Sequence, residues 1–357
     1  MQNLKLMTFS EQLTNWYLPN KRDLPWRNTQ DPYKIWLSEI ILQQTRIEQG
    51  LSYYYTFVEK YPTVADLAAA ELDAVLKDWE GLGYYSRARN LHFTANSVMD
   101  SLNGKFPNSY EELLKLKGVG TYTAAAISSF ASKEKRAVVD GNVYRVLGRL
   151  YNIEDPIDAN PGKKRYQEIA DDLISDKYPD LHNQAIMEFG ATHCTKHKPK
   201  CETCIFQKQC LAFQKNTIDS RPVKKKKNKI QNRYLNFYHI ADQNNFLIQQ
   251  RTDKGIWFQL YQLPLHESLD KRGFDNHIPN LELLGDFEIF SIHPDRNLIH
   301  LLSHQKLHIR FWKIEVKELK KIEQHQLVSL ADPVAKAFPK PISEFLQNQL
   351  KPKLFQK

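Results

Sequence analysis

The sequence predicts two domains of different class: an all-α domain over residues 1–215, then a smaller α+β domain over residues 233–357. Three observations predict this division. The chain has 357 residues, more than the roughly 100–200 of an ordinary single domain. Its first part carries short runs with helical periodicity, whereas its last part alternates with a period near two. A basic segment, residues 216–232, separates the two patterns and is expected to be a linker.

Composition narrows the class of protein further. Hydrophobic residues make up 41% of the chain and charged residues 25%, which is typical of a globular protein and not of a disordered one. No stretch approaches the roughly 18 uninterrupted apolar residues of a membrane helix. The first thirty residues lack the apolar core and cleavage site of an export signal, so we expect a cytoplasmic protein. The net charge of +9 favours a polyanionic partner.

Proline, glycine and asparagine divide the first domain into helices. The clearest helix start is at Asp31 and Pro32, where a capping aspartate precedes a proline in the first turn. We expect no strand in this domain. The expected helices span residues 32–44, 72–79, 85–102, 109–116, 121–131, 142–150, 162–174 and 181–191.

The second domain follows a run of like charge. Residues 221–233, RPVKKKKNKIQNR, carry seven basic side chains and no acidic one, which is typical of a solvated tether. Aromatic and β-branched residues then dominate four segments that we expect to be strands, and two segments have helical patterns. The strands are expected over residues 235–241, 245–251, 283–290 and 306–316, and the helices over residues 266–274 and 334–350.

All four cysteines lie close together near the end of the first domain. Cys194, Cys201, Cys204 and Cys210 leave gaps of six, two and five residues. A secreted scaffold would spread its cysteines, whereas four thiolates in one short loop can converge on a single metal site. The spacing suits zinc or an iron–sulfur cluster and does not choose between them.

A glycine turn stands between two expected helices of the first domain. Gly118 and Gly120 flank Val119, after a helix that we expect to end at Lys117 and before one that begins near Thr121. Such glycines let a backbone approach an anion closely, and the free N–H groups of the second helix favour a phosphate. The alternative is an ordinary corner between two helices.

Two carboxylates are candidates for chemistry. Glu39 shares a helix face with apolar residues and has no basic residue four positions away, so we expect its pKa to be raised. The alternative is a solvated surface glutamate. Asp140 stands where a helix with a buried stripe of Val143, Val146, Leu147 and Leu150 begins. It is either a plain N-cap or an ionised group that faces a developing cation.

Together these segments resemble one family of DNA repair enzymes. WLSEIILQQT, GLGYYSRARNL, GVGTYTAAAI and VVDGNVYRVLGR are similar to motifs of the A/G-specific adenine DNA glycosylases, within the endonuclease III superfamily of helix-hairpin-helix glycosylases. The resemblance is dense over residues 8–215 and looser beyond. It implies a helix-hairpin-helix over residues 109–131 and a [4Fe–4S] cluster loop over residues 194–210, and it leaves open a monovalent cation at the hairpin.

The resemblance also implies a mechanism. Glu39 would protonate adenine at N7, Asp140 would stabilise the sugar cation, and Tyr122 and Asn142 would orient Asp140 and the water. Bifunctional relatives carry a lysine at the position of Tyr122, whose amine attacks the sugar. A tyrosine there implies an enzyme that removes the base without cutting the strand. The substrate would be double-stranded DNA with adenine opposite 8-oxoguanine or guanine, bound by a monomer at a bacterial nucleoid.

Further roles are carried over by position. Four residues match the surroundings of the extruded adenine: Trp26, Arg27, Leu42 and Gln184. Gln44 and Tyr84 match residues that wedge into the base stack, while Thr45 and Leu82 match residues near the opposite base. The alternative for Trp26, Leu42 and Leu82 is that they are core residues.

The last domain resembles the Nudix-like lesion reader of the family, without the catalytic Nudix signature. Ser303 and His304 stand in its lesion-sensing loop, where Leu302 replaces a phenylalanine. His300, His304 and His308 recur every four residues, but the neighbouring alternation favours strands over a helical metal site.

Two rival interpretations remain at this point. One is a bifunctional glycosylase and lyase of the endonuclease III type that acts on oxidised pyrimidines. The other is a DNA-binding module without catalytic activity, for which Glu39 would be dispensable.

Overall fold

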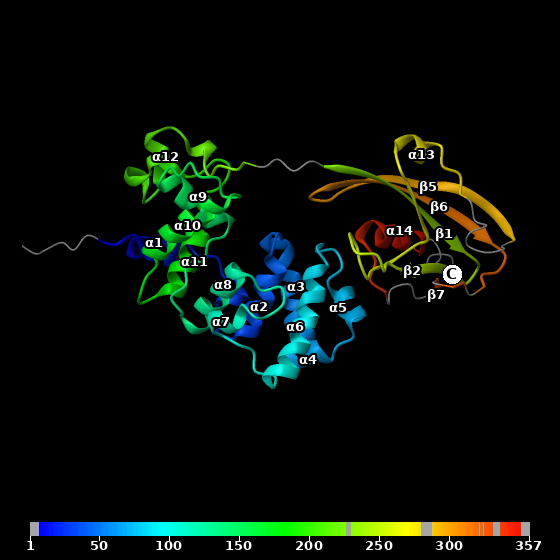
Figure 1. Ribbon diagram of the computed structural model, residues 1–357, viewed down its shortest axis with the longest axis horizontal. Helices are drawn as coiled ribbons and strands as arrows, with labels where there is room; N and C mark the ends of the chain where they lie inside the picture. The colour runs from blue at the N-terminus through cyan, green and yellow to red at the C-terminus, as the bar shows by residue number, and fades with distance from the viewer. Residues whose placement is uncertain are drawn as a thin grey trace, which may run out of the picture. The chain divides into compact units, whose positions relative to one another are not determined.

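The structure, a computed structural model, describes residues 7–225, 230–279, 288–320, 322–323, 325–330 and 336–350 (Figure 1). Its contacts divide the chain into two compact units. The helical unit contains Met1–Ala69 and Asn90–Lys227, and the sheet unit contains Ala70–Arg89 and Asn228–Lys357. The segment Ala70–Arg89 therefore packs with the C-terminal part of the chain, a long-range pairing that local periodicity does not reveal. The boundary expected near residue 215 stays a prediction.

Helices make up the helical unit, and its described residues contain no strand, as predicted. The main helices are α1 (Phe9–Asn20), α2 (Pro32–Leu42), α3 (Ile47–Lys60), α4 (Val64–Ala69), α6 (Ser86–Leu102, which starts in the other unit), α7 (Tyr110–Leu113), α8 (Thr121–Ser132), α9 (Gly141–Leu150), α10 (Asn160–Leu173), α11 (Pro179–Thr192) and α12 (Leu211–Gln214). Short 3-10 turns stand at η1 (Pro25–Arg27), η2 (Cys201–Thr203), η3 (Gln207–Gln209) and η4 (Ile218–Ser220).

Side-chain caps fix where several helices begin. The hydroxyl of Thr8 and the carboxylate of Glu11 form a reciprocal capping box at α1. Asp31 accepts a hydrogen bond from the backbone N–H of Tyr33 at the start of α2, as the sequence predicted. The predicted stripe of α9 is also confirmed, because Val143, Val146, Leu147 and Leu150 are all buried. This stripe packs in one core with residues of α1, α10 and α11.

The predicted hairpin is present with a shorter first helix. Helix α7 ends at Leu113 and not at Lys117, because single turns closed by the N–H groups of Leu116 and Val119 follow it. Gly118 has a φ of +82°, and a Cβ there would lie 3.0 Å from the Cβ of Asn90. Glycine is therefore required at this position for both backbone conformation and space. Gly120 directly precedes α8.

Residues before the lysine run lie against the helical unit. The N–H of Ile157 donates to the carbonyl of Val223 at 3.0 Å, and the N–H of Lys225 donates to Asp158 at 3.0 Å. Arg221 pairs with Glu154 at 2.9 Å. The expectation of a solvated tether over residues 221–233 is wrong for residues 221–225, because their polar groups find partners on the folded unit. Residues 226–229 lie outside the described residues.

A mixed sheet forms the other unit. Its strands are β1 (Gln231–Ala241), β2 (Asn245–Gln250), β3 (Tyr261–Gln262), β4 (Leu265–Ser268), β5 (Ile289–Leu301), β6 (Gln305–Val316) and β7 (Gln326–Ser329). They follow the order β3-β2-β1-β6-β5, with β4 paired to β1 and β7 to β2. The β1–β6 pair is parallel and the other pairs are antiparallel. Helices α5 (Leu72–Asp78), α13 (Lys271–Asp275) and α14 (Lys340–Leu350) complete the unit.

The α+β class predicted for this unit is confirmed, with local corrections. His266 lies in β4 and not in a helix, because α13 starts only after the capping Asp270. Residues 283–287 of an expected strand and residues 334–335 of an expected helix lie outside the described residues. His300 lies in β5, His304 in the following turn and His308 in β6. They belong to a strand hairpin, as the alternation predicted.

Candidate active site

One cavity of the helical unit gathers the expected catalytic residues together with the expected surroundings of the adenine. Its volume is about 200 Å³, and it is walled by α2, α8, α11, the 3-10 turn η1 and the start of α9. Both carboxylates face it, although they stand 101 positions apart in the chain (140 minus 39). Nine of the expected residues line it: Trp26, Arg27, Glu39, Leu42, Thr45, Tyr122, Asp140, Asn142 and Gln184.

Glu39 is a buried acid with a raised pKa. Its side chain stands on α2, and the residue is only 7% exposed. The pKa of Glu39 is raised to about 7: burial is the main cause, a hydrogen bond from Tyr122 opposes the rise, and the charge of Asp140 adds to it. The alternative of a solvated surface glutamate is therefore wrong. Near neutral pH this carboxyl group can hold a proton and release it.

Asp140 lines the same cavity and is held as the N-cap of α9. Its carboxylate accepts hydrogen bonds from the backbone N–H groups of Asn142 at 2.8 Å and Val143 at 2.7 Å, and from the Asn142 amide at 2.7 Å. Burial raises the pKa of Asp140, whereas these bonds and nearby Arg145 oppose the rise. The two carboxylates thus differ in kind, because several N–H groups favour the ionised form of Asp140. The position of Asp140 at the start of α9 suits both interpretations, a plain N-cap and an ionised group that faces a developing cation.

An arginine that the sequence did not single out ties Asp140 to the cysteine loop. Arg145 donates to the Asn142 side-chain oxygen at 2.7 Å and to the carbonyl of Cys194 at 2.7 Å. Asn142 in turn donates to Asp140. Gly190 permits this close approach of α11, since a Cβ there would lie 2.7 Å from the Cβ of Asn142. The orientation of Asp140 therefore depends on where the cysteine loop lies.

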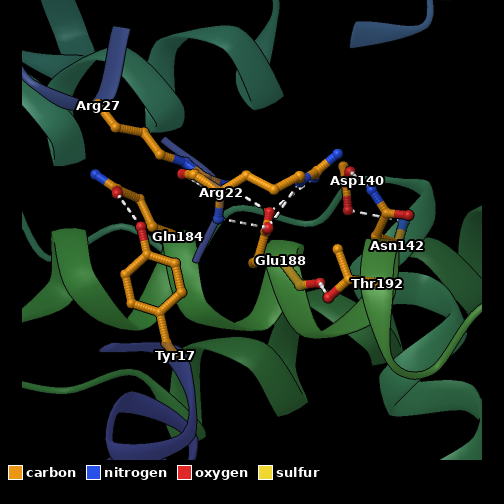
Figure 2. Close-up of polar contacts among 8 residues, drawn as sticks. All are labelled: Tyr17, Arg22, Arg27, Asp140, Asn142, Gln184, Glu188 and Thr192. Carbon is orange, nitrogen blue, oxygen red and sulfur yellow. Dashed lines mark hydrogen bonds and ion pairs between the residues drawn. The ribbon is translucent and has the colours of Figure 1, made fainter. Parts of the chain in front are cut away.

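A charged cluster forms another wall of the cavity (Figure 2). Glu188 accepts hydrogen bonds from Arg22 and Arg27, each at 2.7 Å, and its side chain is fully buried. Burial alone would raise the pKa of Glu188, but these hydrogen bonds lower it to about 2. Gln184 stands one turn earlier on α11 and accepts a hydrogen bond from Tyr17 at 2.7 Å.

Sequence reasoning missed Arg22 and Glu188. For Glu188 a signal was available: it stands four residues after Gln184, and residues so spaced share a helix face.

Comparison with known proteins places this geometry in a family. Residues 37–173 match the model of the HhH-GPD superfamily of base excision DNA repair proteins, and residues 236–348 match a NUDIX domain. The adenine DNA glycosylase of Buchnera aphidicola from Schizaphis graminum is 33% identical over 310 residues, which cover 86% of this chain and 87% of that protein. Its counterpart from the Acyrthosiphon pisum strain is 31% identical over 348 residues, covering 95% and 97%. The chain belongs to the adenine DNA glycosylase family.

Among solved structures, a thermostable thymine-DNA glycosylase is 32% identical to the enzyme, with a TM-score of 0.53. The match covers 58% of this chain and 95% of that one. Both comparisons confirm the predicted fold class, a helix-hairpin-helix glycosylase domain followed by a Nudix-like domain. They do not favour the two rival interpretations.

A second cavity of the glycosylase lies within the sheet unit. Its walls come from residues 81–89, from the turn around Trp257 and from the β5–β6 hairpin. Leu82, Tyr84, Ser303 and His304 all line it, and the hydroxyls of Tyr84 and Ser303 are hydrogen-bonded to each other. Leu82 is buried and Tyr84 is 42% exposed. The structure thus brings together the residues expected at the lesion, except Thr45, which lines the first cavity.

The two residues expected to wedge into the base stack share an unusual backbone. Gln44 has a φ of +56° and Tyr84 has a φ of +48°. Positive φ is uncommon for residues with a side chain and marks positions where the fold imposes the conformation. Both side chains are exposed. Gln44 stands just past the end of α2 and does not line the first cavity.

The four cysteines of the enzyme line one small cavity beside α9 and α11. The Arg149 guanidinium donates to the sulfur of Cys194 at 3.4 Å, and the N–H of Phe206 donates to the sulfur of Cys204 at 3.4 Å. Among the described residues, no three His, Cys, Asp or Glu side chains are placed to hold a single metal ion. Four cysteine sulfurs around a shared space are a donor set that suits a thiolate-bound metal group.

No helix in the described part of the chain has the length and apolar character needed to cross a bilayer.

Proposed function

We propose that this glycosylase hydrolyses the N-glycosidic bond of adenine mispaired with 8-oxoguanine or guanine in double-stranded DNA, without cutting the strand. The observation that carries the proposal is the pairing of Glu39, a buried acid with a pKa near 7, with Asp140 in one cavity. A base turned out of the duplex would enter this cavity at an unstacking cost of a few kcal/mol.

The chemistry follows from the two carboxylates. The protonated carboxyl group of Glu39 gives its proton to N7 of adenine, and the bond between C1′ and N9 breaks with its electron pair leaving on the base. The cationic sugar left behind faces the carboxylate of Asp140, which is fixed by Asn142 and the start of α9. Water then adds to C1′ and gives its proton to the carboxylate of Glu39, which restores the acid.

Tyr122 supports the assignment as a monofunctional enzyme. Burial raises the pKa of Tyr122 well above its usual value, and its hydroxyl is hydrogen-bonded to Glu39. A strand-cutting lyase needs an amine that attacks the sugar. The described lining of the cavity contains arginines but no lysine, so it offers no such nucleophile.

The second cavity supports recognition of 8-oxoguanine by the sheet unit. Ser303 and His304 carry hydrogen-bonding groups at the turn between β5 and β6, opposite Tyr84 and Leu82. Gln44 and Tyr84 are exposed side chains held in fixed backbone conformations, which suits insertion into a base stack. The free N–H groups at Gly120 and the start of α8 suit a DNA phosphate.

A panel of duplexes tests this function. We expect purified enzyme to release the base from duplexes with adenine opposite 8-oxoguanine or guanine, and not from a duplex with cytosine opposite 8-oxoguanine. Strand breaks should appear only after hot alkali, because no amine opens the sugar. Release of oxidised pyrimidines, or nicking without alkali together with efficient borohydride trapping, would contradict the proposal.

We further propose that Cys194, Cys201, Cys204 and Cys210 hold a [4Fe–4S] cluster. When bound, the group supplies a rigid link between the ends of this loop. The protein should therefore be brown, with absorbance near 400 nm and about four iron atoms per chain. Replacing Cys204 by serine should lower iron content and unfolding temperature together, because the loop loses its cross-link. Stoichiometric zinc in the wild type would overturn the assignment.

A further inference from the structure

Glu188 holds two arginines through both of its oxygens. Oε1 accepts from the backbone N–H of Arg22 at 3.1 Å and from its Nε at 2.7 Å. Oε2 accepts from Nη2 of Arg22 at 2.7 Å and from Nη2 of Arg27 at 2.7 Å. Each oxygen thus accepts two hydrogen bonds, so this carboxylate is occupied and is a poor candidate for a second acid or base in the cavity.

Arg27 is fixed from three directions. Besides its bond to Glu188, its Nη1 donates to the carbonyl of Arg22 at 3.0 Å. Its guanidinium also lies over the ring of Tyr17, 5.6 Å from the ring centre. Two of its five N–H groups are used in these bonds, and the residue lines the base cavity with a side chain only 13% exposed. The remaining donors are therefore held in place beside the space that a base would fill (Figure 2).

The charge of Glu188 helps to keep the two arginines in place. Two guanidiniums and one carboxylate leave a single net positive charge at this wall, and without Glu188 it would be two. Arg22 is 35% exposed and can be solvated, whereas Arg27 is nearly buried and depends on its partner. Loss of the Glu188 charge is therefore expected to displace Arg27 more than Arg22.

We propose that Glu188 is a positioning residue for base recognition: it fixes Arg27 as a hydrogen-bond donor to an unprotonated ring nitrogen of the extruded purine. This inference rests on the proposed function. The acceptor is N1 or N3 of adenine, since N7 is the atom that Glu39 protonates. Because the Glu188 oxygens are occupied, this wall offers donors and no free carboxylate, which disfavours a purine that carries a hydrogen on the contacted ring nitrogen, as guanine does at N1.

The test combines a protein change with single-atom changes of the substrate. Glu188→Gln and wild type are compared in single-turnover base release from duplexes with adenine, 1-deazaadenine or 3-deazaadenine opposite 8-oxoguanine. On adenine we expect Glu188→Gln to be about 10- to 100-fold slower, the effect of a lost charged hydrogen bond. On the deaza base that lacks the partner of Arg27, the same variant should lose less than about 3-fold, because the two changes remove one interaction.

Matched variants separate positioning from folding. Glu168→Gln removes a carboxylate that pairs with Lys164 at 3.7 Å on the surface of α10, and it should behave as wild type. If Glu188→Gln does not fold in thermal denaturation, Glu188→Asp keeps the charge but shortens the reach, and the same selective pattern is expected.

A wild-type rate in the Glu188 variant, or an equal penalty on all three bases, would overturn the inference. Failure of the wild type to release adenine from any duplex would instead refute the proposed function.

Discussion

Glu39→Gln is expected to lower adenine release at pH 7 by at least about 100-fold, because positioned general acids contribute roughly 10²–10⁴-fold. Glutamine has nearly the shape of the buried carboxyl group but holds no transferable proton. Binding to the mispair should survive, since the cavity and the hairpin are unchanged. Single-turnover kinetics and a binding assay with the same duplex separate the two effects. Unchanged base release would mean that Glu39 is not the general acid, whereas absence of release by the wild type itself would favour a DNA-binding module.

The same residue predicts two dependences on pH. Base release needs protonated Glu39, so the wild-type rate should fall as pH rises through about 7. Because the pKa of Glu39 is higher in the folded state than in an unfolded chain, the folded protein binds the extra proton between about 4.5 and 7. The stability gained from that proton is present at low pH and is lost as pH rises through 7.

Glu39→Gln removes the free-energy cost of ionising a buried carboxyl group, which lowers the stability of the wild type as pH rises. Relative to wild type, the variant should therefore gain on the order of 1–3 kcal/mol in unfolding free energy between pH 5 and pH 8. Denaturant unfolding at both pH values measures the gain. Glu59→Gln, which changes an exposed glutamate of α3, is the control and should show no such gain. A pH-independent difference would mean that the pKa of Glu39 is not raised in the folded protein.

Asp140→Asn should lower base release by at least about 100-fold as well, for a different reason. An amide carries no charge to stabilise the cationic sugar. Its NH₂ group would also face either the backbone donors of Asn142 and Val143 or the Asn142 side-chain donor. We expect a loss of stability of about 1 kcal/mol, the usual net contribution of one hydrogen bond, because asparagine can still cap the helix. Single-turnover rates and thermal unfolding report the two effects separately.

Asp270→Asn is the matched control for Asp140. Asp270 caps α13 in the sheet unit by accepting from the N–H of Gly273 at 2.7 Å, and it lies outside the first cavity. Asparagine caps helices about as well as aspartate, so this replacement should cost little stability and leave the rate of base release unchanged. If Asp140→Asn lost stability but kept its rate, Asp140 would be an N-cap only, and the proposed mechanism would be wrong.

Local sequence determined the elements and several candidate residues. Asp31 before Pro32 correctly placed the start of α2, and the apolar neighbours of Glu39 correctly indicated burial and a raised pKa. The alternation around His308 indicated a strand. These features depend on residues within a few positions of one another, where helix and strand periodicity act directly. The resemblance to a glycosylase family added roles by position, and those roles remain proposals for this chain.

Some expectations drawn from local sequence were wrong, because turn geometry or contacts between residues distant in the chain determined the structure there. The helix expected to end at Lys117 stops at Leu113, where single turns lead into Gly118. The segment before the lysine run reads as a tether, yet its backbone is bonded to residues such as Ile157 and Asp158. The segment Ala70–Arg89 looks like one more helical stretch, but it packs with the sheet unit.

By itself, the sequence determined two domains of different class, the acid at position 39 and the crowding of four cysteines. Only the tertiary structure decided that Glu39 and Asp140 share a cavity, that Arg145 joins Asn142 to the cysteine loop, and that Glu188 holds Arg22 and Arg27 from 166 and 161 positions away. The physical reason is that periodicity reports only which side of an element is buried. Which elements then meet depends on packing among side chains distant in the chain, and no local pattern carries that information.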